Sequence, residues 1–233
     1  MKQKLLSVKL RRDELERSLG GGIPTSSLIL LEGPDGAGKS IVSQRLSFGL
    51  VRGERTVTYI SSELNTQGFI EQMASLDYDV KYDMLDDKLL FIPMFPYYGQ
   101  SRLNSDMLQK LAHCKRLFDS DVIVFDTLSF LLVNDNISQE ESFQFISFLK
   151  QLTSLEKSIV MCVDPEHLNA KFLTLLRSVC DVILDLELRT FAGQLVRIIN
   201  VRRFKRSGGE VLSSIPFRVE PGKGLVIEIA SFS

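Results

Sequence analysis

Short, nearly continuous apolar segments alternate along this chain with longer segments in which apolar residues recur every three or four positions. The first pattern is typical of buried strands and the second of helices that cover them. The predicted strands are residues 27–32, 56–61, 88–93, 121–126 and 158–163. The predicted helices are residues 13–19, 39–51, 66–76, 103–118, 138–155 and 167–179. Because strands and helices alternate, we expect an α/β fold with a mostly parallel central sheet flanked by helices.

The pattern changes after residue 179. Residues 182–187, 195–201 and 225–229 are β-rich and are separated by segments that contain glycine. Such spacing predicts a C-terminal β-hairpin extension of the sheet. No polar linker interrupts the hydrophobic pattern over residues 1–233, so we expect a single domain.

Composition narrows the class of protein. With 44% hydrophobic residues, the chain can bury a sizeable core. Its 28 basic and 29 acidic side chains nearly cancel, so no overall field would attract nucleic acid or an anionic membrane. The most apolar run, residues 122–133, is interrupted by Asp126 and is shorter than the roughly 18 residues that span a bilayer. The N-terminus has no signal-peptide pattern and the three cysteines are not clustered, so we expect a cytoplasmic protein.

A phosphate-binding loop follows the strand predicted at 27–32. Residues 33–40 read GPDGAGKS and match the pattern G-x-x-x-x-G-K-[ST] in full. Glycines let the backbone amides turn inward around phosphate oxygens, and the following helix presents its positive N-terminus. Lys39 would reach the β- and γ-phosphates, and the Ser40 hydroxyl would bind Mg²⁺. The sequence therefore predicts a site for ATP and Mg²⁺ that consists of Gly33, Pro34, Asp35, Gly36, Ala37, Gly38, Lys39, Ser40 and Ile41.

A second protein ligand for the metal is predicted at the end of the strand 121–126. Asp126 follows four apolar residues, and the carboxyl ends of parallel strands meet at the edge where the phosphate loop lies. A carboxylate at the end of a buried strand can also serve as a cap or turn residue. Beside a phosphate loop, we expect Asp126 to bind the magnesium that bridges the β- and γ-phosphates.

Glu63 is the candidate for orienting the water that attacks the γ-phosphate. It follows the strand predicted at 56–61, and hydrolysis requires a carboxylate or an equivalent group on a strand next to the loop. The alternative for Glu63 is a solvated charge that caps the next helix. Its neighbour Ser62 cannot act as a base. Glu32 is expected to be a structural acid, because the turn of the loop points its side chain elsewhere.

A dense basic cluster lies in the C-terminal part of the chain. Residues 202–206 read RRFKR and precede a Ser-Gly-Gly sequence, so we expect them to project from a tight, exposed turn. Such a cluster can simply be solvated. Alternatively, Arg202 or Arg203 acts as an arginine finger on the γ-phosphate of a nucleotide in a neighbouring subunit, because a guanidinium suits phosphate geometry.

Several motifs together resemble one protein family. The sequence LGGGIP at residues 19–24 precedes the strand LILLE and the phosphate loop, an order that resembles KaiC-like members of the RecA superfamily. The sequence DTLS at residues 126–129 resembles the metal-binding strand of that family, and the segment from Arg197 to the final strand resembles its closing hairpins. The resemblance covers nearly the whole chain. It implies a RecA-like P-loop NTPase fold and a homo-oligomeric ring.

Within this family, the chain resembles the single-domain ATP-binding components of the archaeal swimming filament (archaellum) motor. That resemblance implies a peripheral place at the cytoplasmic face of the motor, with the motor ATPase FlaI, the membrane platform FlaJ and a FlaX-type scaffold as partners, and contact with the membrane only through them. KaiC-like enzymes usually carry two adjacent acids where this chain has Ser62 and Glu63. They also place a polar γ-phosphate sensor at the end of a strand, where this chain has Val163, Asp164 and Pro165 and only Asp164 is polar. We therefore expect slow hydrolysis or none.

Three functions are compatible with these observations. The first, which the missing acid favours, is a regulatory ATP-binding subunit whose occupancy controls ring assembly and partner interaction. The second is an active ATPase or autokinase of the KaiC kind. The third is a RecA-like recombinase that binds DNA, but the near-neutral charge and the lack of a long basic, glycine-rich loop between Asp126 and Ser158 disfavour it. We therefore expect no nucleic-acid partner.

Overall fold

The computed structural model describes residues 4–94, 115–131, 139–191 and 194–228 of the chain. Its strands are β1 (Leu5–Leu6), β2 (Ile23–Pro24), β3 (Leu28–Glu32), β4 (Val57–Ser61), β5 (Leu89–Pro93), β6 (Val122–Asp126), β7 (Ser158–Val163), β8 (Val182–Phe191), β9 (Gln194–Phe204), β10 (Ser214–Glu220) and β11 (Gly224–Ile227). Its α-helices are α1 (Leu15–Ser18), α2 (Lys39–Arg52), α3 (Thr66–Ser75), α4 (Lys81–Leu85), α6 (Leu128–Leu131), α7 (Gln139–Ser154) and α8 (Ala170–Val179). Two short 3₁₀ helices are η1 (Lys115–Phe118) and η2 (Pro165–His167).

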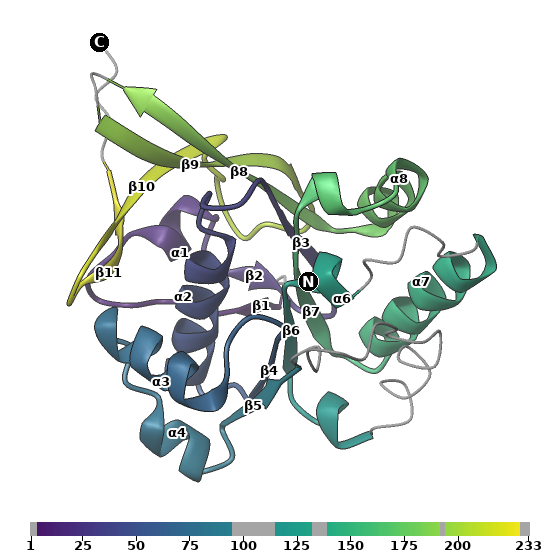
Figure 1. Ribbon diagram of the computed structural model, residues 1–233, viewed down its shortest axis with the longest axis horizontal. Helices are drawn as coiled ribbons and strands as arrows, with labels where there is room; N and C mark the ends of the chain where they lie inside the picture. The colour runs from purple at the N-terminus through teal and green to yellow at the C-terminus, as the bar shows by residue number, and fades with distance from the viewer. Residues whose placement is uncertain (1–3, 95–114, 132–138, 192–193, 229–233) are drawn as a thin grey trace, which may run out of the picture.

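One large sheet organises the described part of the chain (Figure 1). It has nine strands in the order β11-β10-β9-β8-β3-β7-β6-β4-β5. From β8 to β5 all neighbouring strands are parallel, whereas β9, β10 and β11 add antiparallel neighbours at the other end. The predicted α/β fold with a mostly parallel sheet and a C-terminal β-hairpin extension is therefore confirmed.

Helices cover both faces of this sheet, which explains why the parallel strands are apolar along their whole length. Along β3, Ile29 and Leu31 belong to one hydrophobic core and Leu28 and Leu30 to the other, because successive side chains point to opposite faces. The first core packs against α2 and α3, and the second against α7 and α8, on opposite sides of the sheet (Figure 1). Packing from both sides holds the strands firmly and so positions the polar residues at their carboxyl ends.

β8 and β9 are longer than the predicted strands 182–187 and 195–201, and β10 is a further strand that the sequence pattern does not predict. β8 and β9 pair with each other as far as Phe191 and Gln194. The segment of β10 contains Pro216, and proline cannot donate a hydrogen bond to a ladder. In the structure Pro216 lies opposite Ile198 on β9, and its carbonyl accepts a hydrogen bond from the Glu228 amide on the other side.

Parts of two predicted helices lie outside the described residues. Of the segment 103–118, the structure describes only residues 115–118, which form η1. Of the segment 138–155, the first residue is not described, and α7 ends at Ser154. No helix in the described ranges is long and apolar enough to cross a lipid bilayer.

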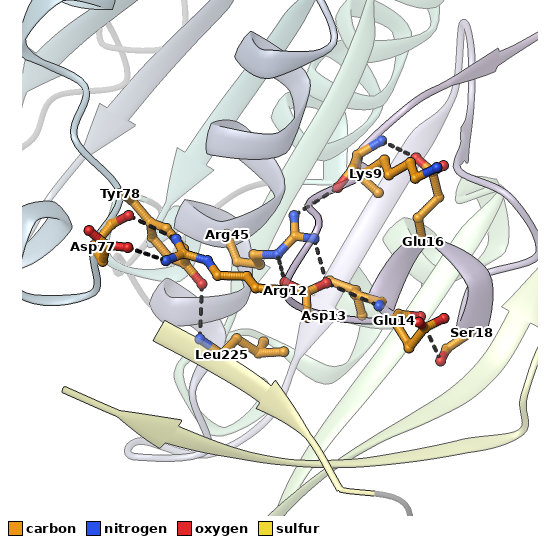
Figure 2. Close-up of polar contacts among 12 residues, drawn as sticks. Lys9, Arg12, Asp13, Glu14, Glu16, Ser18, Arg45, Asp77, Tyr78 and Leu225 are labelled. Carbon is orange, nitrogen blue, oxygen red and sulfur yellow. Dashed lines mark hydrogen bonds and ion pairs between the residues drawn. The ribbon is translucent and has the colours of Figure 1, made fainter. Parts of the chain in front are cut away.

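A buried ion pair joins the N-terminal segment to α2, the helix that follows the phosphate loop. The Arg45 guanidinium donates from Nε and Nη2 to the two carboxylate oxygens of Asp13, each at 2.6 Å. Its Nη1 atom donates to the Val8 carbonyl at 2.9 Å. Both charged side chains are 0% exposed, and Figure 2 shows them pointing directly at each other. The fork of donors satisfies the carboxylate in a place that water does not reach.

The neighbouring Arg12 connects the same segment to two further elements. It donates to the Asp77 carboxylate at 2.5 Å and to the Asp77 carbonyl at 2.8 Å, and its guanidinium lies 4.8 Å from the centre of the Tyr78 ring. The Tyr78 hydroxyl in turn accepts a hydrogen bond from the Leu225 amide on β11 at 2.9 Å (Figure 2). The N-terminal segment, the turn after α3 and the last strand are therefore linked.

Candidate nucleotide site

Residues 33–38 form a tight loop between β3 and α2, at the carboxyl edge of the parallel strands, and Lys39 and Ser40 begin the helix. Gly38, just before α2, has φ +98°, a left-handed conformation that favours glycine. A Cβ atom at this position would lie 3.1 Å from Phe217 Cζ and 3.2 Å from Arg197 Cδ. Gly38 also provides no capping side chain, so the first amides of α2 can face an anion.

The other loop residues differ in exposure. Pro34, Asp35 and Gly36 are exposed, whereas Ala37 is buried and Ile41, in the first turn of α2, is half-buried. The Ala37 amide donates to the Pro34 carbonyl at 3.3 Å, which closes the turn. The exposed part of the loop is therefore open to solvent, and its buried part is anchored in the core.

Lys39 lies over the loop that precedes it. Its Nζ atom donates to the Gly33 carbonyl at 2.7 Å and to the Pro34 carbonyl at 3.0 Å. The carboxylates of Asp35 and Asp164 are 3.8 and 4.0 Å away. The Lys39 side chain is only 6% exposed, so its charge is concentrated at the loop and little weakened by solvent.

Ser40 and Asp126 come together although they are far apart in sequence. Asp126 ends β6, beside Ser61 on the parallel neighbour β4, and Ser40 is in the first turn of α2. The Ser40 hydroxyl donates to Asp126 Oδ1 at 3.1 Å. Parallel strands bring these residues to one edge of the sheet, as predicted from the sequence.

A buried tyrosine contacts the other oxygen of this carboxylate. The Tyr59 hydroxyl on β4 donates to Asp126 Oδ2 at 2.6 Å and lies 2.8 Å from the Ser43 hydroxyl. Burial raises the pKa of Asp126 above its usual value, while the hydrogen bond from Tyr59 acts against that shift and the charge of Glu63 adds to it. Tyr59 is not among the predicted site residues, because a tyrosine within an apolar strand is typical of a core residue; its hydroxyl, which requires a partner when buried, is the signal in the sequence.

The residues at this edge fit a magnesium ion. Mg²⁺ binds hard oxygen ligands, keeps several waters, and is usually held by one or two protein oxygens together with phosphate oxygens. Ser40 and Asp126 offer a hydroxyl and a carboxylate oxygen 3.1 Å apart, next to the phosphate loop. Tyr59 leaves Oδ1 of Asp126 directed at Ser40, so one carboxylate oxygen is available to a metal.

Glu63 lies beside Thr127, the residue that follows Asp126. The Thr127 hydroxyl donates to Glu63 Oε1 at 2.8 Å. The Ser62 hydroxyl accepts from the Thr127 amide at 3.1 Å and contacts the Thr127 carbonyl at 3.3 Å. Ser62, where a second acid would stand in KaiC-like enzymes, therefore binds the backbone of the neighbouring segment, and of these two positions only Glu63 offers a carboxylate.

The loop also contacts an arginine that is not among the predicted site residues. Arg197 on β9 donates from Nε to the Gly36 carbonyl at 3.1 Å. No local pattern marks this residue, because its approach to the loop depends on the pairing of β8, β9 and β10.

The arginine cluster is placed differently from the prediction. Arg202 and Arg203 lie within β9 and do not project from an exposed turn, because β9 continues its pairing with β8 up to Phe204. Arg203 Nη1 donates to the carbonyls of Arg177 and Cys180 at 2.6 and 3.0 Å, at the C-terminal end of α8. Arg203 is thus occupied within its own chain.

Arg202 is more accessible than Arg203. It donates from Nε and Nη2 to Asp185 Oδ2 at 2.9 and 2.7 Å, and its side chain is 61% exposed. An exposed ion pair of this kind is weak and can be exchanged for another partner. Of the two predicted finger residues, Arg202 is the one that a neighbouring subunit could reach.

Two further acids have structural contacts. Glu32 is buried and accepts from Arg177 Nε at 2.8 Å, in agreement with its expected structural role. Asp164 follows β7, where its amide donates to the Ser129 hydroxyl at 3.1 Å and its Oδ1 accepts from the Glu166 amide at 2.9 Å. Its other oxygen is the one that faces Lys39.

Comparison with known proteins gives a consistent result. The family model described as the KaiC ATPase matches residues 11–231. An archaeal flagellar ATP-binding protein FlaH from Methanocaldococcus jannaschii is 37% identical over 227 residues, which cover 97% of each chain. A protein of the same description from Methanococcus voltae is 34% identical over 228 residues, which cover 98% of this chain and 99% of that protein.

Solved structures agree with the sequence matches. The crystal structure of the flagellar accessory protein FlaH from Methanocaldococcus jannaschii superposes with a TM-score of 0.88 at 34% identity and covers 97% of this chain and 100% of that one. A KaiC-like protein from Pyrococcus horikoshii superposes with a TM-score of 0.74 at 15% identity, over 97% of this chain and 100% of that one. The second likeness shows the fold alone, and both confirm the RecA-like architecture.

Proposed function

Because this chain belongs to the FlaH family of KaiC-like ATPases, we propose that it is a magnesium-dependent ATP-binding subunit of the archaeal swimming filament motor. We propose further that it is regulatory: ATP occupancy controls assembly and partner interaction, and turnover is slow. The relatives described as archaeal flagellar ATP-binding proteins support ATP binding and a role in the filament, and the arrangement of side chains supports the metal site and slow turnover.

The observation that carries ATP binding is the meeting of three groups at one edge of the sheet. The Lys39 ammonium lies over the loop, the first amides of α2 face the same space, and the Ser40 hydroxyl lies 3.1 Å from Asp126 Oδ1. A triphosphate needs a cation for its β- and γ-phosphates, amides for its phosphate oxygens and two oxygen ligands for its magnesium. These residues supply each of them: Ser40 and Asp126 would hold Mg²⁺, which would neutralise part of the phosphate charge.

Slow turnover is supported by the residues that follow β4. Glu63 alone provides a carboxylate there, and it is engaged by the Thr127 hydroxyl at 2.8 Å. Its neighbour Ser62 contributes a hydroxyl that binds the Thr127 backbone and cannot accept a proton from water at neutral pH. One carboxylate is a weaker arrangement for activating water than two adjacent ones.

Assembly belongs to the same proposal. We propose a ring in which Arg202 of one subunit approaches the γ-phosphate bound by the next, because Arg202 is exposed on β9 and its pairing with Asp185 is exchangeable. The motor ATPase FlaI, the membrane platform FlaJ and a FlaX-type scaffold are the partners proposed from the family's role. Contact with the membrane would come through them.

An active ATPase of the KaiC kind is the second candidate. The observation that favours it is the position of Glu63, whose carboxylate accepts a 2.8 Å hydrogen bond from the hydroxyl of Thr127, the residue next to Asp126. A carboxylate so close to a metal ligand can orient water toward a γ-phosphate. Single-turnover hydrolysis by the purified protein distinguishes the two functions: a rate typical of working ATPases, about 1 s⁻¹ or faster, would favour the second.

Calorimetric titration with ATP in the presence of Mg²⁺ tests the proposed ATP binding. We expect Lys39→Ala to lose measurable ATP binding while its thermal unfolding stays close to that of the wild type, because it removes the cation that lies over the loop. The matched control is Lys81→Ala, an exposed lysine at the start of α4. ATP binding by Lys39→Ala with the affinity of the wild type would refute the site.

A further inference from the structure

The closing strands of the sheet cover one side of the phosphate loop, and Arg197 on β9 is the side chain that bonds to it. Its Nε atom donates to the Gly36 carbonyl at 3.1 Å. The stem of the same side chain lies against Gly38, where its Cδ atom is 3.2 Å from the position a Cβ atom would take. Its terminal nitrogens make no hydrogen bond or ion pair within the described part of the chain.

The register of the antiparallel strands determines this contact. Arg197 pairs with Phe217 on β10, and the Phe217 ring lies 3.1 Å from the same Cβ position on Gly38. On β8, the Leu186 carbonyl lies 2.3 Å from where a Cβ atom of Gly33 would be. Both ends of the loop therefore pack against the closing strands, and Arg197 adds the hydrogen bond between them.

We propose that Arg197 is a positioning residue of the nucleotide site, which holds the phosphate loop in its phosphate-binding conformation through the Gly36 carbonyl. The inference rests on the proposed binding of ATP. In a trans peptide, the carbonyl of Gly36 and the amide of Ala37 point in opposite directions. The Ala37 amide donates to the Pro34 carbonyl at 3.3 Å, so a guanidinium on the Gly36 carbonyl fixes the same peptide from its other side and stabilises the turn on which the phosphate-binding amides depend.

Holding the loop in advance increases affinity, because less conformational freedom is lost when a phosphate arrives. The loop amides cradle phosphates that ATP and ADP share, so a positioning role predicts an equal effect on both nucleotides. A direct contact between the terminal nitrogens of Arg197 and the γ-phosphate predicts a loss for ATP alone. The ratio of the two affinities therefore separates positioning from direct binding.

The test uses Arg197→Met, which keeps an unbranched stem against Gly38 and removes every donor. We expect calorimetry with Mg²⁺ to show affinities for ATP and ADP that are both about tenfold weaker, the usual effect of losing one charge-assisted hydrogen bond. Arg197→Lys should restore most of the affinity, because its ammonium can donate to the same carbonyl. Arg189→Met is the matched control, since Arg189 lies on β8 of the same hairpin and pairs with Glu187.

A second measurement does not depend on nucleotide. Amide hydrogen exchange of the nucleotide-free protein should be several-fold faster at residues 33–38 in Arg197→Met than in the wild type or in Arg189→Met, with the thermal midpoint unchanged. Wild-type affinity and wild-type exchange in Arg197→Met would overturn the inference, and so would a loss confined to ATP. A wild-type protein that binds no ATP would refute the proposed function, whereas unchanged loop exchange would refute the role of Arg197 separately.

Discussion

The Thr127 hydroxyl donates a 2.8 Å hydrogen bond to the carboxylate of Glu63 and so connects the residue after the proposed metal ligand to the proposed water-orienting acid. The two residues come from different strand ends, those of β6 and β4, which are parallel neighbours. The bond fixes the direction of a carboxylate that would otherwise be free to rotate. Any hydrolysis by this protein should therefore depend on both side chains.

We expect Glu63→Gln to lower the rate of single-turnover ATP hydrolysis by roughly a hundredfold or more while ATP affinity is retained, because the amide keeps the size of the side chain and loses its basicity. Thr127→Val should lower the rate about tenfold, since the acid remains but is no longer oriented. Glu71→Gln, an exposed position on α3, is the control. Undiminished hydrolysis in Glu63→Gln would show that another group orients the water.

Tyr59→Phe should weaken the dependence of ATP binding on magnesium. The hydroxyl that donates to Asp126 Oδ2 is lost, and removal of such a partner of a metal ligand typically costs about tenfold or more in metal affinity. Titrating Mg²⁺ at fixed ATP should give a midpoint about tenfold higher, with unchanged nucleotide binding in EDTA. The control is Tyr78→Phe, which removes a hydroxyl that lies away from the site and accepts a hydrogen bond from the Leu225 amide. Its magnesium midpoint should match that of the wild type. Equal midpoints for all three proteins would exclude a role for Tyr59 at the metal.

Arg202 and Arg203 should behave differently when each is replaced by alanine. Arg202→Ala should remove the preference of self-association for ATP over ADP, because the finger interacts with a charge present only before hydrolysis, and thermal stability should be almost unchanged. Arg203→Ala should lower thermal stability, because the last carbonyls of α8 lose their donor. Sedimentation at matched protein and Mg²⁺ concentrations, with thermal unfolding of each variant, measures both effects. If the wild type associates equally with ATP and with ADP, Arg202 is not an arginine finger and its role is limited to the ion pair with Asp185.

The Asp13–Arg45 pair should matter for stability. Arg45→Met leaves the Asp13 carboxylate buried without its partner, which typically costs about 3–5 kcal/mol of unfolding free energy. The double variant Asp13→Leu with Arg45→Met should recover much of that loss, since it leaves no unpaired charge. Guanidinium unfolding measures the unfolding free energies of the wild type, the single variant and the double variant. Lys88→Met, which removes an exposed pair with Glu54, is the control. A single variant as stable as the control would mean that water reaches the carboxylate.

Local sequence was sufficient for the parallel part of the fold and for the phosphate loop. Both faces of the sheet are covered, so burial requires apolar residues along the whole length of β3, β4, β6 and β7, and these runs are visible in the sequence. The glycine loop between a strand and a helix requires residue types that few other structures need. Since the carboxyl ends of parallel strands share one edge, the proximity of Ser40 and Asp126 also follows from the order of elements.

Only the tertiary structure decided which side chains complete the site. The approach of Arg197 to Gly36, the use of Arg203 at the end of α8 and the bond of Tyr59 to Asp126 join residues far apart in sequence. Register in the antiparallel extension depends on the pairing of β8, β9 and β10, and a shift of one residue would turn each arginine to the opposite face. Periodicity reports whether a position is buried and not which distant group it meets, because those contacts depend on packing between elements.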